Sequence, residues 1–387
     1  MSEIKVNSIK GVGASAAAIT VNNTDGTCTA NLTNNLSNRN MVINGASEIS
    51  QRYGTTSTSI SGTGSQFPVD RFIVQTNLGS GHSHQQVADA PTGFYYSQKV
   101  TCGTGGSATG SNFGRYRTTL EWQNVIPQSG FGTSGAKQLV LSFYVKSSLT
   151  GTFGVAIQSY ANNRNIVNTY TINSANTWER KTIVIAADTN SAWVATTAIH
   201  MEIGWDLGEG PDRGQDTLNT WAGGQDGYGY DSGTKFFTQS SATWQITGIQ
   251  LEVDNTNSGK ATDFEHRSLG QELQLCKRYY QQYVNISAVG NVPDNGSRSY
   301  SHALMFPVEM RAAPTITISN TGSSNGQVVT DAENNTYISS LLSTGVQTTN
   351  ATISFYLTGD LTNYRGAYLI NTASTANQTT YKITAEL

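Results

Sequence analysis

The sequence predicts an all-β protein that is built from several parts. Short segments in which apolar and polar residues alternate recur along most of the 387 residues, with turn-rich stretches between them. Helical periodicity is confined to residues 268–283. Eighteen Tyr and six Trp residues indicate packed domains, because disordered chains are poor in aromatic residues. Together these observations favour antiparallel sandwiches or jelly rolls.

The composition excludes some classes of protein. Charged residues are 13% of the chain and the net charge is −3, so we expect no strongly basic nucleic-acid-binding surface. No run of about 18 apolar residues is present, and so no membrane insertion is expected. The first residues lack the pattern of a signal peptide. Cys28, Cys102 and Cys276 are widely spaced, which indicates reduced thiols in a protein made in a cytoplasm.

Residues 1–40 form the first predicted region. This segment is too polar for a hydrophobic core of its own, and Asp25 with Gly26 gives a hairpin signal. We therefore expect it to be either disordered or ordered by partner chains.

Residues 41–267 are predicted to form a jelly-roll β-sandwich. A long loop rich in Gly and Asp follows Trp205 and extends to Lys235, and loops of this length are usually functional or disordered. The expected strands are residues 69–74, 139–146, 152–157, 177–185, 199–205 and 244–253.

Residues 268–284 are predicted to form a short connecting helix. Ser268 and Gln271 fit a capping box. One apolar stripe follows the helix, and its spacing leaves two alternatives open: packing on the chain's own sandwich, or self-association of several copies. The stripe consists of Leu269, Leu273, Cys276, Tyr280 and Tyr283.

Residues 285–387 return to strand patterns at 315–318, 351–357 and 381–385 and are predicted to form a second, small β-sandwich. Pro307 and Pro314 flank a stretch that we expect to be an edge strand or an extended connector, because proline lacks the donor that a sheet requires.

The loop after Trp205 holds the best candidate binding residues. Aromatic rings stack on the C–H faces of sugars, and Asp accepts hydrogen bonds from their hydroxyl groups. Trp221, Tyr228, Tyr230 and Asp226 could therefore cradle a glycan. The alternative is that these rings pack on the sandwich edge or on a neighbouring subunit.

The same loop is acidic, and three interpretations stay open: a solvated loop, a calcium site or a pair of glycosidase carboxylates. Its acidic residues are Asp206, Glu209, Asp212, Asp216, Asp226 and Asp231. His82 and His84 form an HxH pattern that could supply half of a metal site, but no third ligand is near in sequence, so a solvated loop is expected there. We predict no metal, no cofactor and, because no catalytic motif is present, no enzyme.

Three segments resemble a known family. They are similar to parts of the tail-fibre-like virion proteins of marine and cyanobacterial tailed phages, in which the second segment closes a jelly roll resembling carbohydrate-binding modules and the third begins a C-terminal knob. The segments are Asp25–Asn40 with Val42–Ala46, Ile246–Val253 with Ala261–Ser268 and Glu272–Tyr280, and Phe306–Pro314.

The resemblance implies a homotrimeric virion protein whose residues 1–40 form an intertwined arm that docks to a tail or other virion protein. The helix stripe would then lie at the trimer interface. The expected function is a tail fibre that binds a host-surface glycan without catalysis. A capsid or head appendage is the first alternative, and a polysaccharide depolymerase tailspike is the second, although no repeat of about 20–50 residues is visible.

Overall fold

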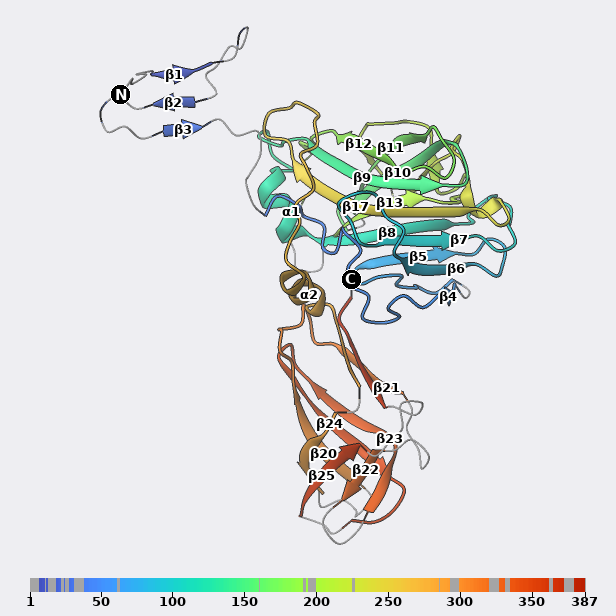
Figure 1. Cartoon of the computed structure of the whole chain (residues 1–387), viewed down its shortest axis with the longest axis vertical. Helices are drawn as coiled ribbons and strands as arrows, with labels where there is room; N and C mark the ends of the chain where they lie inside the picture. The colour runs from blue at the N-terminus through green and yellow to red at the C-terminus, as the bar shows by residue number, and fades with distance from the viewer. Residues whose placement is uncertain are drawn as a thin grey trace. The chain divides into compact units, whose positions relative to one another are not determined.

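The computed structural model describes residues 7–10, 12, 19–21, 24, 28–30, 38–60, 63–159, 161–190, 193, 200–224, 227–284, 286–292, 299–319, 327–330, 335–361, 365–371 and 379–386. Strands are the main regular structure among these residues, with two short α-helices, which confirms the predicted all-β class (Figure 1). They divide into two compact units. Unit 1 comprises Met1–Gly45, Thr76–Ser80 and Cys102–His266, and unit 2 comprises Ala46–Gln75, Gly81–Thr101 and Arg267–Leu387.

The strand boundaries follow the alternating segments closely. Unit 1 contains β1 (Ser8–Ile9), β2 (Ile19–Val21), β3 (Cys28–Ala30), β8 (Gly114–Glu121), α1 (Trp122–Ser129), β9 (Leu139–Ser147), β10 (Gly151–Ser159), β11 (Arg164–Ile172), β12 (Glu179–Ile185), β13 (His200–Asp206), β14 (Gly214–Gln215), β15 (Ala222–Gly223), β16 (Gly229–Tyr230), the 3-10 helix η1 (Phe236–Thr238) and β17 (Thr243–Val253).

Unit 2 contains the remaining elements. They are β4 (Thr58–Ser59), β5 (Phe72–Thr76, whose last residue belongs to unit 1), β6 (Ser83–Val87), β7 (Ser97–Thr101), α2 (Leu269–Lys277), β18 (Tyr280–Val284), β19 (Ala288–Asn291), β20 (Ser299–Met305), β21 (Thr315–Ser319), β22 (Gln327–Thr330), β23 (Asn335–Val346), β24 (Asn350–Leu357), β25 (Gly366–Asn371) and β26 (Thr380–Thr384).

The body of unit 1 is a sandwich of two antiparallel sheets. One sheet has the strand order β15-β11-β10-β13-β8, and the other contains β12-β9-β17. Aromatic rings fill the space between them: Phe143 of β9 packs edge-on against Trp205 of β13, and Trp244 of β17 contacts Tyr116 of β8. These rings are fully buried, as the inward half of each alternating strand should be.

The N-terminal part of unit 1 contains a small antiparallel sheet with the order β1-β2-β3. In the β2–β3 pair, Ile19 lies opposite Ala30 and Val21 lies opposite Cys28. The predicted hairpin residues Asp25 and Gly26 lie outside the described residues.

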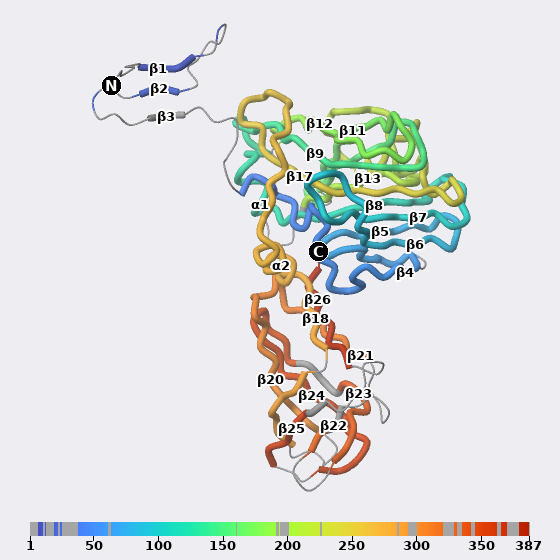
Figure 2. The backbone as a smooth tube through the Cα atoms, viewed as in Figure 1, coloured from blue at the N-terminus to red at the C-terminus, as the bar shows by residue number. Residues whose placement is uncertain are grey.

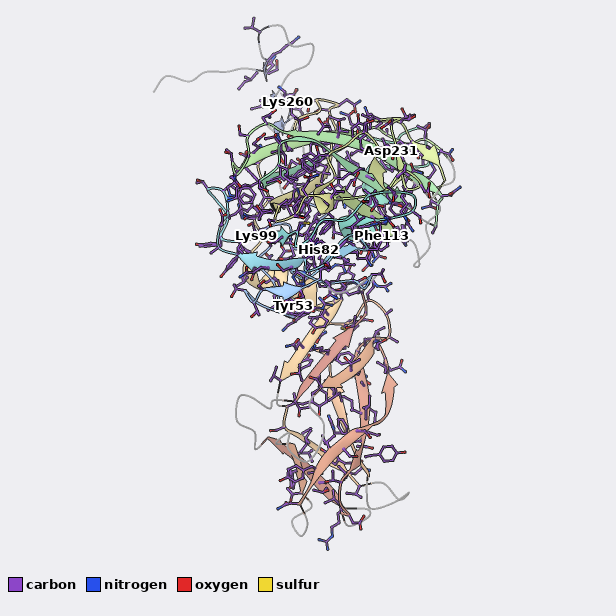
Figure 3. All side chains as sticks on the ribbon, turned by 90° about the vertical axis from the view of Figure 1, so that its right-hand side faces the viewer. Tyr53, His82, Lys99, Phe113, Asp231 and Lys260 are labelled. Atoms are coloured by element: carbon purple, nitrogen blue, oxygen red, sulfur yellow. The ribbon has the colours of Figure 1, made fainter. Side chains whose placement is uncertain are left out.

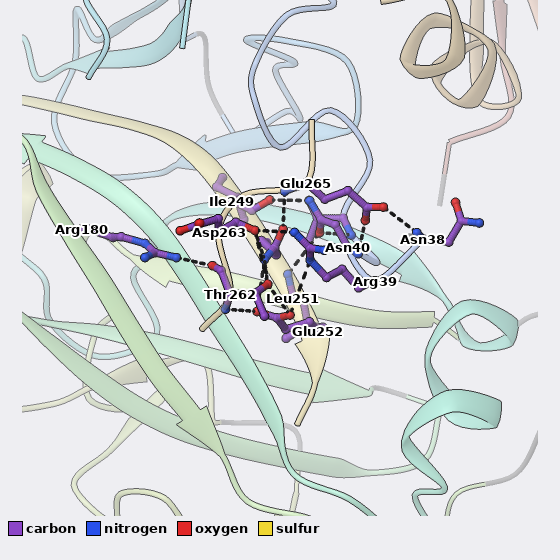
Figure 4. A network of polar contacts seen from close by, with 12 residues as sticks. Asn38, Arg39, Asn40, Arg180, Ile249, Leu251, Glu252, Thr262, Asp263 and Glu265 are labelled. Carbon is purple, nitrogen blue, oxygen red and sulfur yellow. Dashed lines mark hydrogen bonds and ion pairs between the residues drawn. The ribbon is translucent and has the colours of Figure 1, made fainter. Parts of the chain in front are cut away.

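A polar network joins residues 38–40 to the region after β17 (Figure 4). The Glu265 carboxylate accepts the backbone N–H groups of Asn38 and Asn40, and the Asn40 side chain donates to the Ile249 carbonyl at 3.2 Å. Thr262 donates its backbone N–H and its hydroxyl to the buried Glu252 carboxylate, each at 2.8 Å. Two of the three segments that carry the resemblance are therefore held together by their own polar side chains.

The C-terminal part of unit 2 contains two separate sets of paired strands (Figure 2). Six strands close into a barrel with the order β19-β20-β24-β23-β22-β25, and three others form a sheet with the order β18-β26-β21. Ile353, Phe355 and Leu369 point into the core of this part together with Tyr381 of β26. The region predicted to be a small β-sandwich is thus all-β. It consists of a six-stranded closed barrel and a three-stranded sheet.

Two predicted boundaries differ from the structure, and one open alternative is decided by it. The helix ends at Lys277 rather than at residue 284, because Tyr280–Val284 pairs along its length with β26. Strand β5 begins at Phe72 rather than at residue 69, because Arg71 has a left-handed backbone with φ 73°. The stretch between Pro307 and Pro314 contains no strand and is the connector that the two prolines allow.

Candidate functional site

The outer face of the larger unit 1 sheet is unusually polar. Strand pairing places Gln158 of β10, Glu202 of β13 and Thr119 of β8 side by side, and the next row holds Ala156, Gly204 and Arg117. The other face of the same strands carries the apolar core, so these side chains point away from it. Gln158 and Glu202 are nonetheless buried, at 5% and 7% exposed.

One end of this outer face is covered by the chain after β13. A Cβ atom built on Gly154 would lie 2.7 Å from the backbone nitrogen of Tyr230, so β16 lies directly on β10 at that point. Lys235 fixes the covering segment, because its Nζ atom lies 2.6 Å from Asp206 and donates to the Tyr230 carbonyl at 2.7 Å. We call residues 206–235 the covering loop; Asp231 within it is labelled in Figure 3.

Two buried carboxylates lie at the start of the covering loop. Asp206 accepts the backbone N–H groups of Gly208, Glu209 and Tyr230 as well as the Lys235 ammonium, and burial raises its pKa. Glu209 lies 2.7 Å from Arg115, yet burial raises its pKa to about 8 against the effect of that guanidinium.

In the remaining part of the outer face, no other described segment packs closely on Gly204, which is itself buried. Among the described residues, a Cβ atom built there would meet only Glu202 Oε1 within 4 Å, at 3.8 Å. Glu202 forms an ion pair with Arg117 through its other oxygen. Glu202 Oε1, Gln158 Nε2 and Arg117 Nε are buried and have no hydrogen-bond partner within the described chain. We call Arg117, Gln158, Glu202 and Gly204 the open polar face.

Unsatisfied buried polar atoms are costly and uncommon in folded proteins. Three of them on adjacent strands, beside space that a side chain could occupy, form a surface that a polar ligand would complete. The open polar face is therefore the candidate functional site.

The predicted glycan cradle is distributed over separate places. Trp221 packs edge-on against Phe131 and Trp193, with ring centroids 5.6 and 5.5 Å apart, and its indole N–H donates to the Ala186 carbonyl. Tyr228 instead lies over Arg115, whose guanidinium carbon is 4.0 Å from the ring centroid. Tyr230 belongs to the parallel pair of β14 and β16, and Asp226 lies outside the described residues.

The acidic residues and histidines have distinct environments. Asp216 is exposed and accepts two hydrogen bonds from Ser232, whereas Asp206 and Glu209 are buried in ion pairs.

His82 and His84 are both buried, so the expectation of a solvated loop was wrong: His84 lies on β6 and packs edge-on against Tyr53. Within the described ranges, no three His, Cys, Asp or Glu side chains gather closely enough to hold a metal ion.

The predicted interface residues do not share one surface. Leu269 is 60% exposed at the start of α2, and Leu273 and Tyr283 are half-buried. Cys276 and Tyr280 are buried inside the chain, and Tyr280 lies on β18 rather than on the helix. The capping box of Ser268 and Gln271 is confirmed. No described helix has the length and apolar character that a membrane crossing requires.

The open polar face was missed at the sequence level. The alternation in residues 199–205 already places Glu202 and Gly204 opposite Met201, Ile203 and Trp205. What the sequence lacks is the order of the strands, which brings Gln158 and Arg117 to either side of them.

Comparison with known proteins gives structural neighbours only. No protein-family model matches the chain, and no curated protein matches it. Carbohydrate-binding modules and a phage tailspike domain are among the solved structures that align with it.

Three of these neighbours show which kinds of protein align with the chain. The enzymatically active domain of tailspike protein 4 from bacteriophage CBA120 is 14% identical, with a TM-score of 0.29, over 56% of this chain and 22% of that one. A putative sugar binding protein from Bacteroides thetaiotaomicron is 9% identical, with a TM-score of 0.30, over 56% and 100%. A family 11 carbohydrate-binding module from Clostridium thermocellum, in complex with a β-1,3-1,4-mixed-linked tetrasaccharide, is 10% identical, with a TM-score of 0.26, over 55% and 99%.

Proposed function

We propose that this chain is a tail-fibre protein of a tailed-phage virion that binds a glycan on the host surface and performs no catalysis. The observation that carries glycan binding is the open polar face, where Gln158, Glu202 and Arg117 present unpaired polar atoms around Gly204. Hydroxyl groups donate and accept hydrogen bonds, so a polyhydroxylated ligand would satisfy both kinds of atom.

The absence of catalysis is supported by the state of the acidic pair. Asp206 and Glu209 are each held by a cation and covered by β16, so neither carboxylate is presented to a substrate. Release of reducing sugar from host polysaccharide by the purified protein would contradict this part of the proposal.

Glycan binding is tested by filling the open polar face. Gly204→Leu places a side chain in the space that a ligand would use, and we expect it to abolish binding of the full-length protein to an array of host-type oligosaccharides. Gly204→Ala, which adds only the atom that the structure accommodates, should keep most of the binding. Equal binding by the wild type and Gly204→Leu would show that the glycan does not bind at the open polar face.

We also propose a homotrimer that docks to the virion through residues 1–40 and meets the host with its outer domains. The exposed Leu269 and the half-buried Leu273, one turn apart on α2, offer apolar surface for self-association. Light scattering should give three times the chain mass of 41.5 kDa. A monomeric mass would contradict it.

Location is tested by immunogold electron microscopy of intact virions with an antibody against residues 285–387. Gold at the tail or its fibres is the expected result. Gold spread over the head would replace the tail fibre with a capsid appendage or decoration protein.

A further inference from the structure

Three cations on the outer face of the unit 1 sheet each pair with a carboxylate. Arg115 pairs with Glu209 at 2.7 Å, Lys235 pairs with Asp206 at 2.6 Å, and Arg117 pairs with Glu202. Each cation therefore already has a carboxylate partner, and in the first two pairs that partner is fully buried.

The remaining nearby cation does not serve the open polar face. The Arg213 guanidinium donates to the Ser111 carbonyl at 2.7 Å and lies 5.9 Å from the ring centroid of Tyr228, which belongs to the covering loop. Phe113, labelled in Figure 3, lies beside the same guanidinium at 5.4 Å. A ligand above Gly204 would meet Arg117 as its nearest cation, and Arg117 is already neutralised.

The unpaired atoms of the open polar face are of both kinds. Glu202 Oε1 accepts hydrogen bonds, whereas Gln158 Nε2 and Arg117 Nε donate them. A hydroxyl group serves either kind of partner, so neighbouring hydroxyls of one sugar ring would satisfy the acceptor and a donor together. A carboxylate, phosphate or sulfate only accepts, and it would face the free oxygen of Glu202 with a like charge.

We infer that the open polar face accepts an uncharged, hydroxyl-bearing sugar and rejects an acidic one. This inference rests on the proposed glycan binding and names the class of glycan. Glu202 acts in it twice, as an acceptor for the ligand hydroxyl and as the charge that excludes anions.

The test compares neutral and acidic probes on one array with the full-length protein. The neutral probes are maltohexaose, cellohexaose and xylohexaose, and the acidic probes are hexagalacturonate, polysialic acid and chondroitin sulfate. The wild type should bind at least one neutral probe and no acidic probe. Its binding to the neutral probe should change less than about twofold between roughly 50 and 500 mM NaCl, because an uncharged sugar forms no ion pair that salt could screen.

Variants separate the two roles of Glu202. Glu202→Gln removes the charge and keeps the shape, so neutral binding should fall by about tenfold and acidic binding should appear at Arg117. Gln158→Lys adds a cation while the Arg117–Glu202 pair stays intact, and it should also gain acidic binding. Gln158→Leu should lose neutral binding by about tenfold without that gain. Thermal melts identify any variant that fails to fold, and the Gln158 variants carry the test if Glu202→Gln is unstable.

The Gly204→Leu variant distinguishes failure of the charge inference from failure of the proposed glycan binding. Acidic binding by the wild type that disappears in Gly204→Leu would overturn the charge inference and keep the proposed function. An absence of binding to every probe, or binding that Gly204→Leu leaves unchanged, would overturn the use of this face for glycans.

Discussion

Arg52 and Glu386 lie 334 positions apart in the sequence and form an ion pair with a nitrogen-to-oxygen distance of 3.1 Å. Both side chains are about nine-tenths buried. Arg71, which is 2% exposed, pairs with the other oxygen of Glu386 and lies 3.5 Å from the ring centroid of Tyr279. Within unit 2, one carboxylate near the end of the chain thus fixes two guanidinium groups of the segment before β5.

Glu386→Gln should strongly destabilise unit 2. The substitution keeps the shape but removes the carboxylate charge that Arg52 and Arg71 share, so that Arg52 keeps Asp70 at 3.6 Å as its charged partner. Removing one partner of a buried ion pair costs about 3–5 kcal/mol. Urea denaturation followed by fluorescence measures the change. Glu309→Gln is the matched control, because Glu309 is exposed and should change the unfolding free energy by less than about 0.5 kcal/mol. Equal effects of the two variants would show that the ion pairs are not stabilising.

His302→Phe should make unit 2 more resistant to acid. Burial lowers the pKa of His302 to about 4, so the unfolded chain, at about 6.5, binds a proton more readily than the folded one. Stability from neutral His302 is therefore lost as the pH falls below about 6.5. Phe fits among Tyr300 and Phe355, which contact the ring. Between pH 7 and 4.5 the variant should lose about 2–3 kcal/mol less than the wild type.

Two other buried groups allow the contribution of His302 to the pH dependence of stability to be checked. His84 has its pKa lowered to about 4 by burial, so His84→Phe should act in the same direction and add to His302→Phe. Asp70 acts oppositely: burial raises its pKa to about 6, so its contribution to stability declines as the pH rises from about 4 to 6. A parallel pH dependence in the wild type and both histidine variants would refute the prediction.

Gly154 and Gly204 should respond differently to the same substitution. Gly154→Ala places a methyl group against the backbone of Tyr230 and should cost about 1–3 kcal/mol, because β16 must move. Gly204→Ala meets only Glu202 Oε1 at 3.8 Å among the described residues, and it should cause no loss. Thermal melts of the two variants are the measurement. A similar loss at both positions would indicate that the face above Gly204 is covered as well.

Trp221→Ala distinguishes the loop cradle from the open polar face. Trp221 packs on Phe131 and Trp193, so its truncation should lower the unfolding free energy of unit 1 by about 2–4 kcal/mol. Glycan binding measured well below the melting temperature should persist. Lost binding with an unchanged melt would instead place the ligand on the covering loop, as the aromatic composition of that loop predicts.

The fold class was accessible from the sequence because alternation and turns are local signals. Strands such as β9, β17 and β24 start and end within a residue or two of the predicted segments. The helix was predicted too long because its apolar stripe continues into Tyr280 and Tyr283. Those residues favour strands equally well, and pairing with β26 decides between the two structures.

The site was less accessible because it depends on neighbours that are distant in sequence. Gln158 and Glu202 lie opposite each other only through the β10–β13 register, which alternation does not specify. The familiar segments likewise indicated architecture rather than chemistry. Asn40, Glu252 and Glu265 use their polar groups to hold the chain at the end of the N-terminal region.

The place of β26 in its sheet determines when this part of the molecule is able to fold. It lies between β18 and β21, both of which leave the ribosome earlier and pair with β26 rather than with each other. Until Thr380–Thr384 has been synthesised, the backbone groups of both earlier strands are satisfied only by water. Nascent chains that stall before this point would expose two strand edges that are prone to aggregate, so slow translation of the segment up to Thr384 would lower the yield of folded protein.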